Sequence, residues 1–364
     1  MLYGKPYGEA DVHDPSDGQA DQPAAGTPSG ERGGGLGEPA VGERTLPPAP
    51  TPQEIAARVQ ALTSQQRRRA DAAARREIPR EFGAGRRVET LWWRAALLSE
   101  GCPLICVSSA DGGVGRSALT AALGGLLALA VPEPVVAVDA TLRAWGGLEH
   151  RVVRRSSSTV WDAVAAGGDL ADSSVAERLT QVGPTGLRVL VGESKLLSQR
   201  RPPTWPEMFA VVGHLRLAFR MALLDLPTAD STSTWRALGW ATVPVVVSRA
   251  TVDSVQHTLR LLAHMRAAGL TRVPDQAVLV VMATSPSVAR EVRAVEQLAR
   301  QAAAVLVRVP YDPVLVRTDP LDPRMLTKAT RSAMTEVAAA VIDRCPADPA
   351  AVHGPRSSAS NGEN

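Results

Sequence analysis

The feature that most constrains the fold is a short apolar run, followed by a glycine-rich turn and then by a longer apolar stretch. Leu104-Ile-Cys-Val-Ser108 is apolar up to its last residue, which is typical of a strand buried on both faces of a sheet. Gly112, Gly113 and Gly115 follow, and the alanine- and leucine-rich run 117–130 has the length and composition of a helix. A strand, a tight turn and a helix that packs back on the sheet are the start of an α/β unit.

The same alternation of apolar runs and helical stretches continues to the end of the domain. The expected strands cover residues 104–108, 135–139, 187–192, 220–226, 243–248, 277–283 and 305–309. The expected helices cover residues 117–130, 207–219, 252–268, 287–303 and 326–344. The sequence therefore predicts the α/β class, with a doubly wound, mostly parallel sheet.

The glycine-rich turn also has the chemistry of a phosphate site. Its three glycines let the backbone curl with the amide N–H groups pointing inward, and the N-terminus of the next helix adds positive potential. In the common phosphate loop, G-x-x-x-x-G-K-[ST], the lysine reaches the outer phosphates and the hydroxyl residue holds Mg²⁺. Here Ser117 supplies the hydroxyl, whereas Ala110 replaces the first glycine and Arg116 replaces the lysine.

At these residues the chain resembles the ParA/MinD family of P-loop ATPases, whose loop reads K-G-G-x-G-K-[ST]. Val135-Val-Ala-Val-Asp139 resembles the family's second strand, which ends in its switch I aspartate. Leu223-Leu-Asp225-Leu-Pro227 resembles the Walker B strand, and Val309-Pro-Tyr-Asp312 resembles the late P-x-D loop beside the adenine. Order and spacing match over about residues 100–343, roughly two thirds of the chain. Within the family, the composition is most similar to actinobacterial ParA/MinD-like proteins, some of them linked to type VII secretion.

The resemblance implies ATP and Mg²⁺ as cofactors. It assigns nucleotide binding to Gly112, Gly113, Val114, Gly115, Arg116, Ser117, Pro310 and Asp312. Ser117 and Asp225 would hold the metal, because a hydroxyl and a carboxylate are the oxygen ligands that Mg²⁺ prefers. Asp139 would take the catalytic position.

Several residues depart from the family pattern. Asp111 stands where the family carries its signature lysine, which reaches the partner subunit's nucleotide in an ATP sandwich dimer. A carboxylate there is unfavourable unless it is protonated, turned away or masked by metal. Arg116 keeps the charge of the phosphate-loop lysine but not its compact shape, and Thr141 replaces the second acidic residue of the family's D-x-D. Because both lysines stabilise the transition state of phosphoryl transfer, their loss favours nucleotide binding with weak or absent hydrolysis.

Four functional hypotheses follow from these matches and departures. The first is an ATP-binding pseudo-ATPase that acts as a regulatory or positioning switch for a protein complex. The second is an active ParA/MinD-type ATPase in partitioning or secretion, which would form a nucleotide-dependent homodimer. The third is a nucleotide-free scaffold that recruits partners through its tail. The fourth is a glycine turn that binds no ligand.

Composition divides the chain into four segments. Residues 1–50 contain 10 Gly and 8 Pro, with 8 acidic and 3 basic residues, so we expect a disordered acidic tail. Residues 51–87 are expected to form a basic helical linker, in which apolar residues share one helical face. Residues 88–344 form the predicted P-loop domain, and residues 345–364 form a flexible C-terminal tail.

Charge and hydropathy limit the partners and the location. The 40 basic and 37 acidic residues are too balanced for a protein that mainly neutralises nucleic acid, so non-specific DNA binding through 67–69 stays open but is not favoured. The longest apolar run, 118–131, is shorter than the roughly 20 residues of a membrane helix. We therefore expect no spanning segment. Residues 1–10 lack the apolar core of a secretory signal, and three cysteines suit a reducing compartment, so we expect a cytoplasmic protein.

Overall fold

The computed structural model describes residues 77–83, 85–96, 98, 101–143, 146–193, 200–286, 297, 305–346. The predicted acidic tail, the basic helix before residue 77 and nearly all of the predicted helix 287–303 lie outside these residues. The predicted C-terminal tail also lies outside them, apart from its first two residues.

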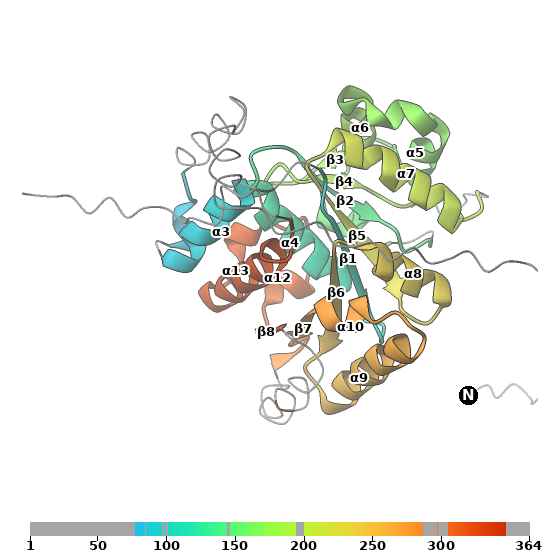
Figure 1. Ribbon diagram of the computed structural model, residues 1–364. Coiled ribbons are helices and arrows are strands. Elements are labelled where there is room, and N and C mark those ends of the chain that lie inside the picture. The colour runs from blue at the N-terminus through green and yellow to red at the C-terminus, as the bar shows by residue number, and fades with distance from the viewer. Residues whose placement is uncertain are drawn as a thin grey trace, which may run out of the picture. The chain divides into compact units, whose positions relative to one another are not determined.

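An eight-stranded sheet lies at the centre of the described residues (Figure 1). Its strands are β1 (Leu104–Ser109), β2 (Val135–Asp139), β3 (Gln181–Val182), β4 (Arg188–Leu190), β5 (Met221–Thr228), β6 (Val243–Arg249), β7 (Val278–Met282) and β8 (Val305–Val309). They lie in the order β3-β4-β2-β5-β1-β6-β7-β8. All neighbouring pairs are parallel except β3 and β4. The predicted α/β fold with a mostly parallel sheet is confirmed.

Helices connect the strands and cover the sheet. The α-helices are α3 (Arg86–Ala96), α4 (Arg116–Ala130), α5 (Val160–Ala166), α6 (Ser173–Leu179), α7 (Trp205–Ala218), α8 (Thr232–Trp240), α9 (Val252–Ala267), α10 (Arg272–Gln276), α12 (Pro313–Val316) and α13 (Lys328–Ile342). The 3₁₀ helices are η1 (Arg80–Phe82), η2 (Glu149–Arg151), η3 (Gly167–Ala171) and η5 (Pro323–Met325). No helix among the residues described is both long and apolar enough to cross a membrane.

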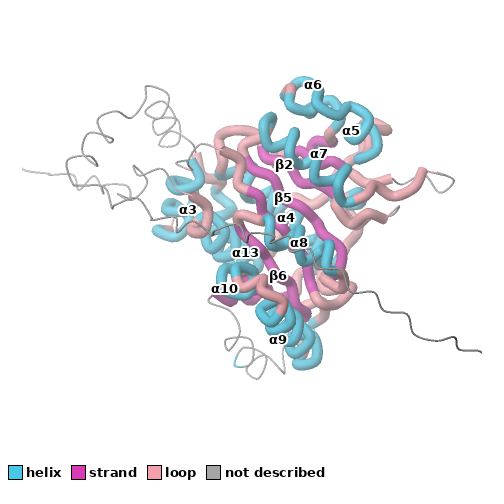
Figure 2. The backbone as a smooth tube through the Cα atoms, turned by 45° about the vertical axis from the view of Figure 1, so that its right-hand side comes forward, coloured by secondary structure: helices cyan, strands magenta, loops and turns pink. Residues whose placement is uncertain are grey.

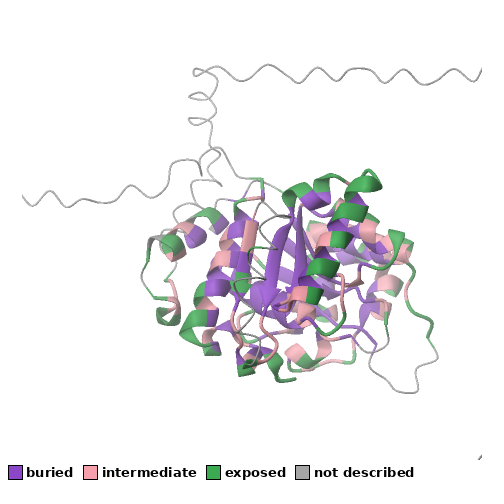
Figure 3. Ribbon diagram, turned by 90° about the horizontal axis from the view of Figure 1, so that it is seen from below, coloured by how far each residue is buried: buried purple, intermediate pink, exposed green. Residues whose placement is uncertain are grey.

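Two apolar layers, one on each face of the sheet, form the core. Side chains alternate along β1, so Ile105 and Val107 join the layer with α3, α4 and α13, whereas Leu104 and Cys106 join the layer with α5 to α10. Figure 2 shows helices on both sides of the strands. In Figure 3 the buried strands lie between helices whose outer sides are exposed.

The helix after the glycine-rich turn is buried more completely than a surface helix. Eleven of the fifteen residues of α4 are buried, since α4 packs on the sheet and is itself covered by α3 and α13. This explains why the sequence of α4 has no polar stripe. The burial also fixes the N-terminus of α4, and with it the glycine-rich turn, against the end of β1.

Strand register brings three segments of the chain together at one edge of the sheet. Val107 pairs with Asp225, and Asp225 pairs in turn with Asp139. The carboxyl ends of β1, β5 and β2 therefore lie side by side. In open α/β sheets this edge is where ligands bind.

The structure differs from the predicted elements mainly where elements are short. β4 is shorter than the expected strand 187–192, and β5 continues two residues past the expected strand 220–226. Strand β3 and helices α5, α6, α8, α10 and α12 were not predicted, because they have two to nine residues and give no clear periodicity. The eleven-residue helix α3 was not predicted either. η1 precedes α3, and the Phe82 ring lies 5.6 Å from that of Trp92. Residues before 88 therefore contribute to the core.

Replacing Leu126 in α4 by alanine should reduce the free energy of unfolding by about 2–5 kcal/mol, because Leu126 is fully buried and the substitution leaves a cavity. Leu217 in α7 is the matched control, since its side chain is 74% exposed. Leu217→Ala should change stability by no more than about 0.5 kcal/mol. Urea denaturation followed by circular dichroism measures both. Equal effects would contradict the buried position of α4.

Candidate functional site

The turn between β1 and α4 depends on glycine at two positions. Gly113 and Gly115 have φ angles of 69° and 94°, in the left-handed region that other residues rarely adopt. A Cβ on Gly115 would also lie 3.1 Å from Cε of Met282. The backbone conformation therefore requires glycine at position 115, and a larger residue would in addition have to displace the end of the Met282 side chain.

The amide groups of this turn are free to bind an anion. Among the described residues, no hydrogen bond is donated by the amides of Gly113, Gly115, Arg116 or Ser117. The last two belong to the first turn of α4, where amides have no partner within the helix. No side chain caps α4, since Gly115 occupies the N-cap position. The turn is therefore an open cradle at a helix N-terminus.

A cleft of about 430 Å³ opens beside this cradle. Its lining residues come from four segments: Gly113, Val114, Gly115, Arg116, Ser117, Ala118; Gly147, His150, Arg151; Met282, Ala283, Thr284; and Leu315, Val316, Thr318. The cleft has the size of small-molecule and cofactor sites. Five of the eight residues predicted to bind nucleotide, 113–117, line it, and Gly112 directly precedes them.

Ser117, Asp225 and Asp139 form a polar trio at the edge of the sheet. Ser117 Oγ donates a hydrogen bond to Oδ2 of Asp225 over 2.5 Å. Oδ1 of Asp225 and Oδ2 of Asp139 are buried and accept no hydrogen bond from another described residue. The unpartnered oxygen of Asp225 beside the Ser117 hydroxyl is a suitable ligand for Mg²⁺. Within the described ranges no three His, Cys, Asp or Glu side chains gather as a metal cage, so phosphate and water would have to complete the coordination.

Burial shifts the protonation of both carboxylates. It raises the pKa of Asp225 to about 7, and the nearby charge of Asp139 adds to the shift, whereas the hydrogen bond from Ser117 and the charge of Arg116 oppose it. Burial also raises the pKa of Asp139. Thr141, which stands where the family has its second acidic residue, opposes that shift because its amide and hydroxyl both donate to Oδ1 of Asp139.

A segment after β2 lies directly against this trio. We call residues 146–158 the strap. A Cβ on Gly147 would overlap Oγ of Ser117, and a Cβ on Gly146 would overlap Oδ2 of Asp139. The backbone of the strap therefore approaches the trio as closely as only glycine permits.

The two residues predicted to stand at the lysine positions of the ParA/MinD motif both form hydrogen bonds to protein groups. Arg116 Nη1 donates to Oγ of Ser109 over 2.7 Å, at the end of β1. Asp111 is turned away from the cleft toward α9. Its Oδ2 accepts from Oγ of Ser254 over 2.6 Å, and its Oδ1 lies 2.8 Å from Nδ1 of His257. Of the three conditions under which a carboxylate is tolerated at position 111, namely protonation, a side chain turned away or masking by metal, the structure therefore shows a side chain turned away from the phosphate site.

Asp312 lies outside the lining of the cleft. The residue is buried, and its two carboxylate oxygens accept hydrogen bonds from the amides of Val314 and Thr327. Asp312 thus caps α12 and fixes the start of α13. Pro310 does not line the cleft either. The chain that follows it lines the cleft at Leu315, Val316 and Thr318.

Sequence reasoning missed the strap residues that line the cleft: Gly147, His150 and Arg151. The family motif contains no position for them. The sequence also gave no reason to single out Arg151, because it is one of many arginines in the chain. Only the folded path of the strap brings them to the cradle.

Comparison with solved structures supports the fold. The chain is similar to a ParA family ATPase from Chlorobium tepidum TLS, with a TM-score of 0.50 and 15% sequence identity, over 69% of this chain and 99% of that chain. It is also similar to the septum site-determining protein MinD from Pyrococcus horikoshii OT3 in complex with Mg-ADP, with a TM-score of 0.47 and 17% identity, over 65% and 94% of the two chains. No family model and no curated protein matches the sequence. The chain therefore has the fold of a ParA family ATPase.

Replacing Gly147 by alanine should lower the free energy of unfolding by about 1–3 kcal/mol, because the new methyl group must displace the strap or Ser117. Gly168→Ala is the matched control, since a Cβ at Gly168 meets no atom within 4 Å. Thermal unfolding compares the two variants. A Gly147 variant as stable as the Gly168 variant would contradict the close contact.

The raised pKa of Asp225 should make the metal-free protein less stable as pH rises. The unfolded carboxyl has a pKa near 3.9, whereas the folded one has a pKa of about 7, so between these values the folded state holds a proton that the unfolded state has lost. The contribution of Asp225 is therefore complete below about pH 4 and is lost as pH rises toward 7, with a slope of at most about 1.4 kcal/mol per pH unit. Urea denaturation in EDTA from pH 4 to 8 should give a shallower decline for Asp225→Asn than for the wild type. Parallel pH profiles would refute the assignment.

Proposed function

We propose that this protein binds ATP with Mg²⁺ and acts as a regulatory or positioning switch for a protein complex, with weak or absent hydrolysis. The observation that carries the proposal is the open amide cradle at the N-terminus of α4 beside the hydrogen-bonded pair Ser117 and Asp225. A cradle of this kind binds phosphate, and the pair offers oxygen ligands to the metal that accompanies a triphosphate.

The parts of a nucleotide would follow one another along the cleft. The amides of residues 113–117 would bind the phosphate chain. Ser117 and Asp225 would hold Mg²⁺, which supplies charge neutralisation for the phosphates. The mostly apolar segments at Met282 and Leu315 line the rest of the cleft and suit the base and sugar.

Three features support weak hydrolysis. No lysine lines the cleft among the described residues, and Arg116 makes its hydrogen bond to Ser109. Asp111 stands at the position of the signature lysine and is hydrogen-bonded to residues of α9, so this position gives no positive charge to a partner subunit's nucleotide. Asp139 has one oxygen bound by Thr141 and the other covered by the strap at Gly146, so it is poorly placed to orient a water molecule.

The loops around the cleft provide a route from nucleotide to partner. Mg²⁺ on Ser117 and Asp225 would act on the strap, which contacts Ser117 at Gly147. The cradle is linked to the surface of α9 through Asp111, and to the end of β6 through the bond from Arg249 Nη2 to the carbonyl of Gly112. Small shifts at a ligand site that are amplified through packed segments are a known switching mechanism. The three buried free cysteines are consistent with action in the cytoplasm.

An active ATPase of the ParA/MinD type, dimerising around nucleotide, is the second candidate. The fold and the Ser117–Asp225 hydrogen bond favour it, because P-loop NTPases hold their Mg²⁺ with a loop hydroxyl and a strand-end aspartate. It differs from the first candidate in turnover and not in the ligand bound.

Titration calorimetry with ATP tests the proposal. Binding should need Mg²⁺, and Ser117→Ala should weaken Mg-ATP binding by about tenfold or more, because it removes a metal ligand. Ser173→Ala, at an exposed position on α6, should bind like the wild type. Phosphate release by the wild type should equal that of the Ser117 variant.

Two results would decide against the proposal. Absence of binding at millimolar ATP would overturn nucleotide binding itself. Phosphate release clearly above that of Ser117→Ala would instead overturn weak hydrolysis and establish the active ATPase.

A further inference from the structure

No lysine of the described residues lines the cleft, but an arginine that the family motif does not include does. Arg151, the last residue of η2, lines the same cleft as the amide cradle. It belongs to the metal end of the cleft, because the strap that carries it contacts Ser117 at Gly147, and Ser117 and Arg151 both line the cleft. Arg151 is thus a cation next to the position that the cradle and the trio define for outer phosphates.

Contacts on both sides hold Arg151 in this position. Its amide donates to the carbonyl of Leu148, and its own carbonyl accepts from the amide of Leu321 over 2.9 Å. Its Nη1 donates to the carbonyl of Arg317, in the segment that follows α12. One guanidinium N–H is therefore used by a neutral acceptor, and the planar fork retains further donors.

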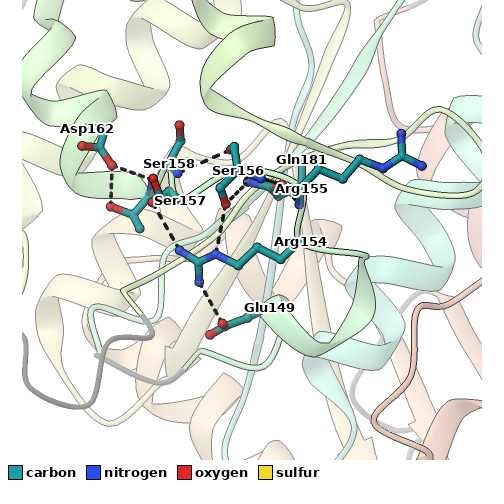
Figure 4. A network of polar contacts seen from close by, with 9 residues as sticks. Glu149, Arg154, Arg155, Ser156, Ser157, Ser158, Asp162 and Gln181 are labelled. Carbon is teal, nitrogen blue, oxygen red and sulfur yellow. Dashed lines mark hydrogen bonds and ion pairs between the residues drawn. The ribbon is translucent and has the colours of Figure 1, made fainter.

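The strap that carries Arg151 is itself fixed by a polar network (Figure 4). Gln181 is 1% exposed, and its Oε1 accepts from the amides of Arg155 and Ser156, over 2.8 and 3.2 Å. Its Nε2 donates to Oγ of Ser156 over 2.8 Å. Arg154 forms a 2.8 Å ion pair with Glu149 in η2. The strap is therefore preorganised and does not need to be ordered by a ligand.

Partial burial lowers the pKa of Arg151, and the charges of Asp319 and Asp225 oppose that shift. An arginine nevertheless remains charged at neutral pH. A half-buried guanidinium beside a phosphate cradle gains more from an anion than an exposed one does, because water screens the interaction less.

We propose that Arg151 binds the outer phosphates of the nucleotide within its own subunit, in the position left by the absent lysines. The guanidinium fork can make two parallel hydrogen bonds to phosphate oxygens, which a lysine cannot. This inference rests on the proposed function, since it concerns the same cleft. It adds that the protein distinguishes ligands by the length of their phosphate chain.

The test uses the full chain, Mg²⁺ and three probes: ATP, AMP and inorganic tripolyphosphate, at fixed ionic strength. Arg151→Gln removes the charge but keeps an N–H group for the carbonyl of Arg317. Arg151→Lys restores the charge without the fork. Arg155→Ala is the matched control, because Arg155 belongs to the same strap, is exposed, and is held through its backbone amide. Thermal unfolding verifies that each variant is folded.

We expect Arg151→Gln to bind ATP and tripolyphosphate about tenfold or more weakly than the wild type, and to bind AMP equally well. Arg151→Lys should recover part of the loss, and Arg155→Ala should show none. Equal affinity of the wild type and Arg151→Gln for ATP would overturn the inference and leave the proposed function intact. Equal losses for AMP and ATP would also overturn it, since they indicate a structural role at Arg317.

Tripolyphosphate separates the two proposals. If the wild type binds tripolyphosphate but not ATP, the proposed function fails, and a weaker tripolyphosphate affinity of Arg151→Gln still supports the role of Arg151. Unchanged tripolyphosphate affinity in that variant would overturn the role. If the wild type binds neither probe, both proposals are overturned.

Discussion

Parallel pairing of β5 with β1 on one side and with β2 on the other is the constraint on which the site depends. The three strands are buried on both faces, so their apolar side chains fix the register, and a slip of one residue would turn each strand's inward side chains to the opposite layer. That register places Asp139 beside Asp225 and aims the chain leaving β1 toward them. Packing of the core thus makes the two carboxylates neighbours. The free energy of that packing offsets the desolvation penalty of burying them.

The fold was largely predictable from sequence because its central strands are apolar runs long enough to recognise. Burial of α4 on all sides made it equally visible. The antiparallel edge strand β3 escaped prediction because two residues carry no period, although its Gln181 anchors the strap. Short elements of this kind are specified by tertiary contacts and not by local pattern.

The candidate site was predictable only in the part that a contiguous motif encodes. The cradle and Ser117 follow from local sequence, and Asp225 from the end of a strand. Asp312 matched a motif, yet in the structure it serves as a helix cap outside the cleft lining. Arg151 had no signal, because its approach depends on the path of the strap between β2 and β3 and on backbone contacts with a segment more than 150 residues later. Long-range backbone pairing of this kind leaves no trace in composition or spacing.

The close approach of the strap has a consequence for solvent. A methyl group and a water molecule are similar in size, so backbone that leaves no room for a Cβ at Gly146 and Gly147 also leaves none for water between itself and the carboxylate and hydroxyl beneath. Solvent therefore cannot hydrate Ser117 and Asp139 from that side. The inner wall of the site is dry, and any hydration shell that a bound ion keeps must face the cleft.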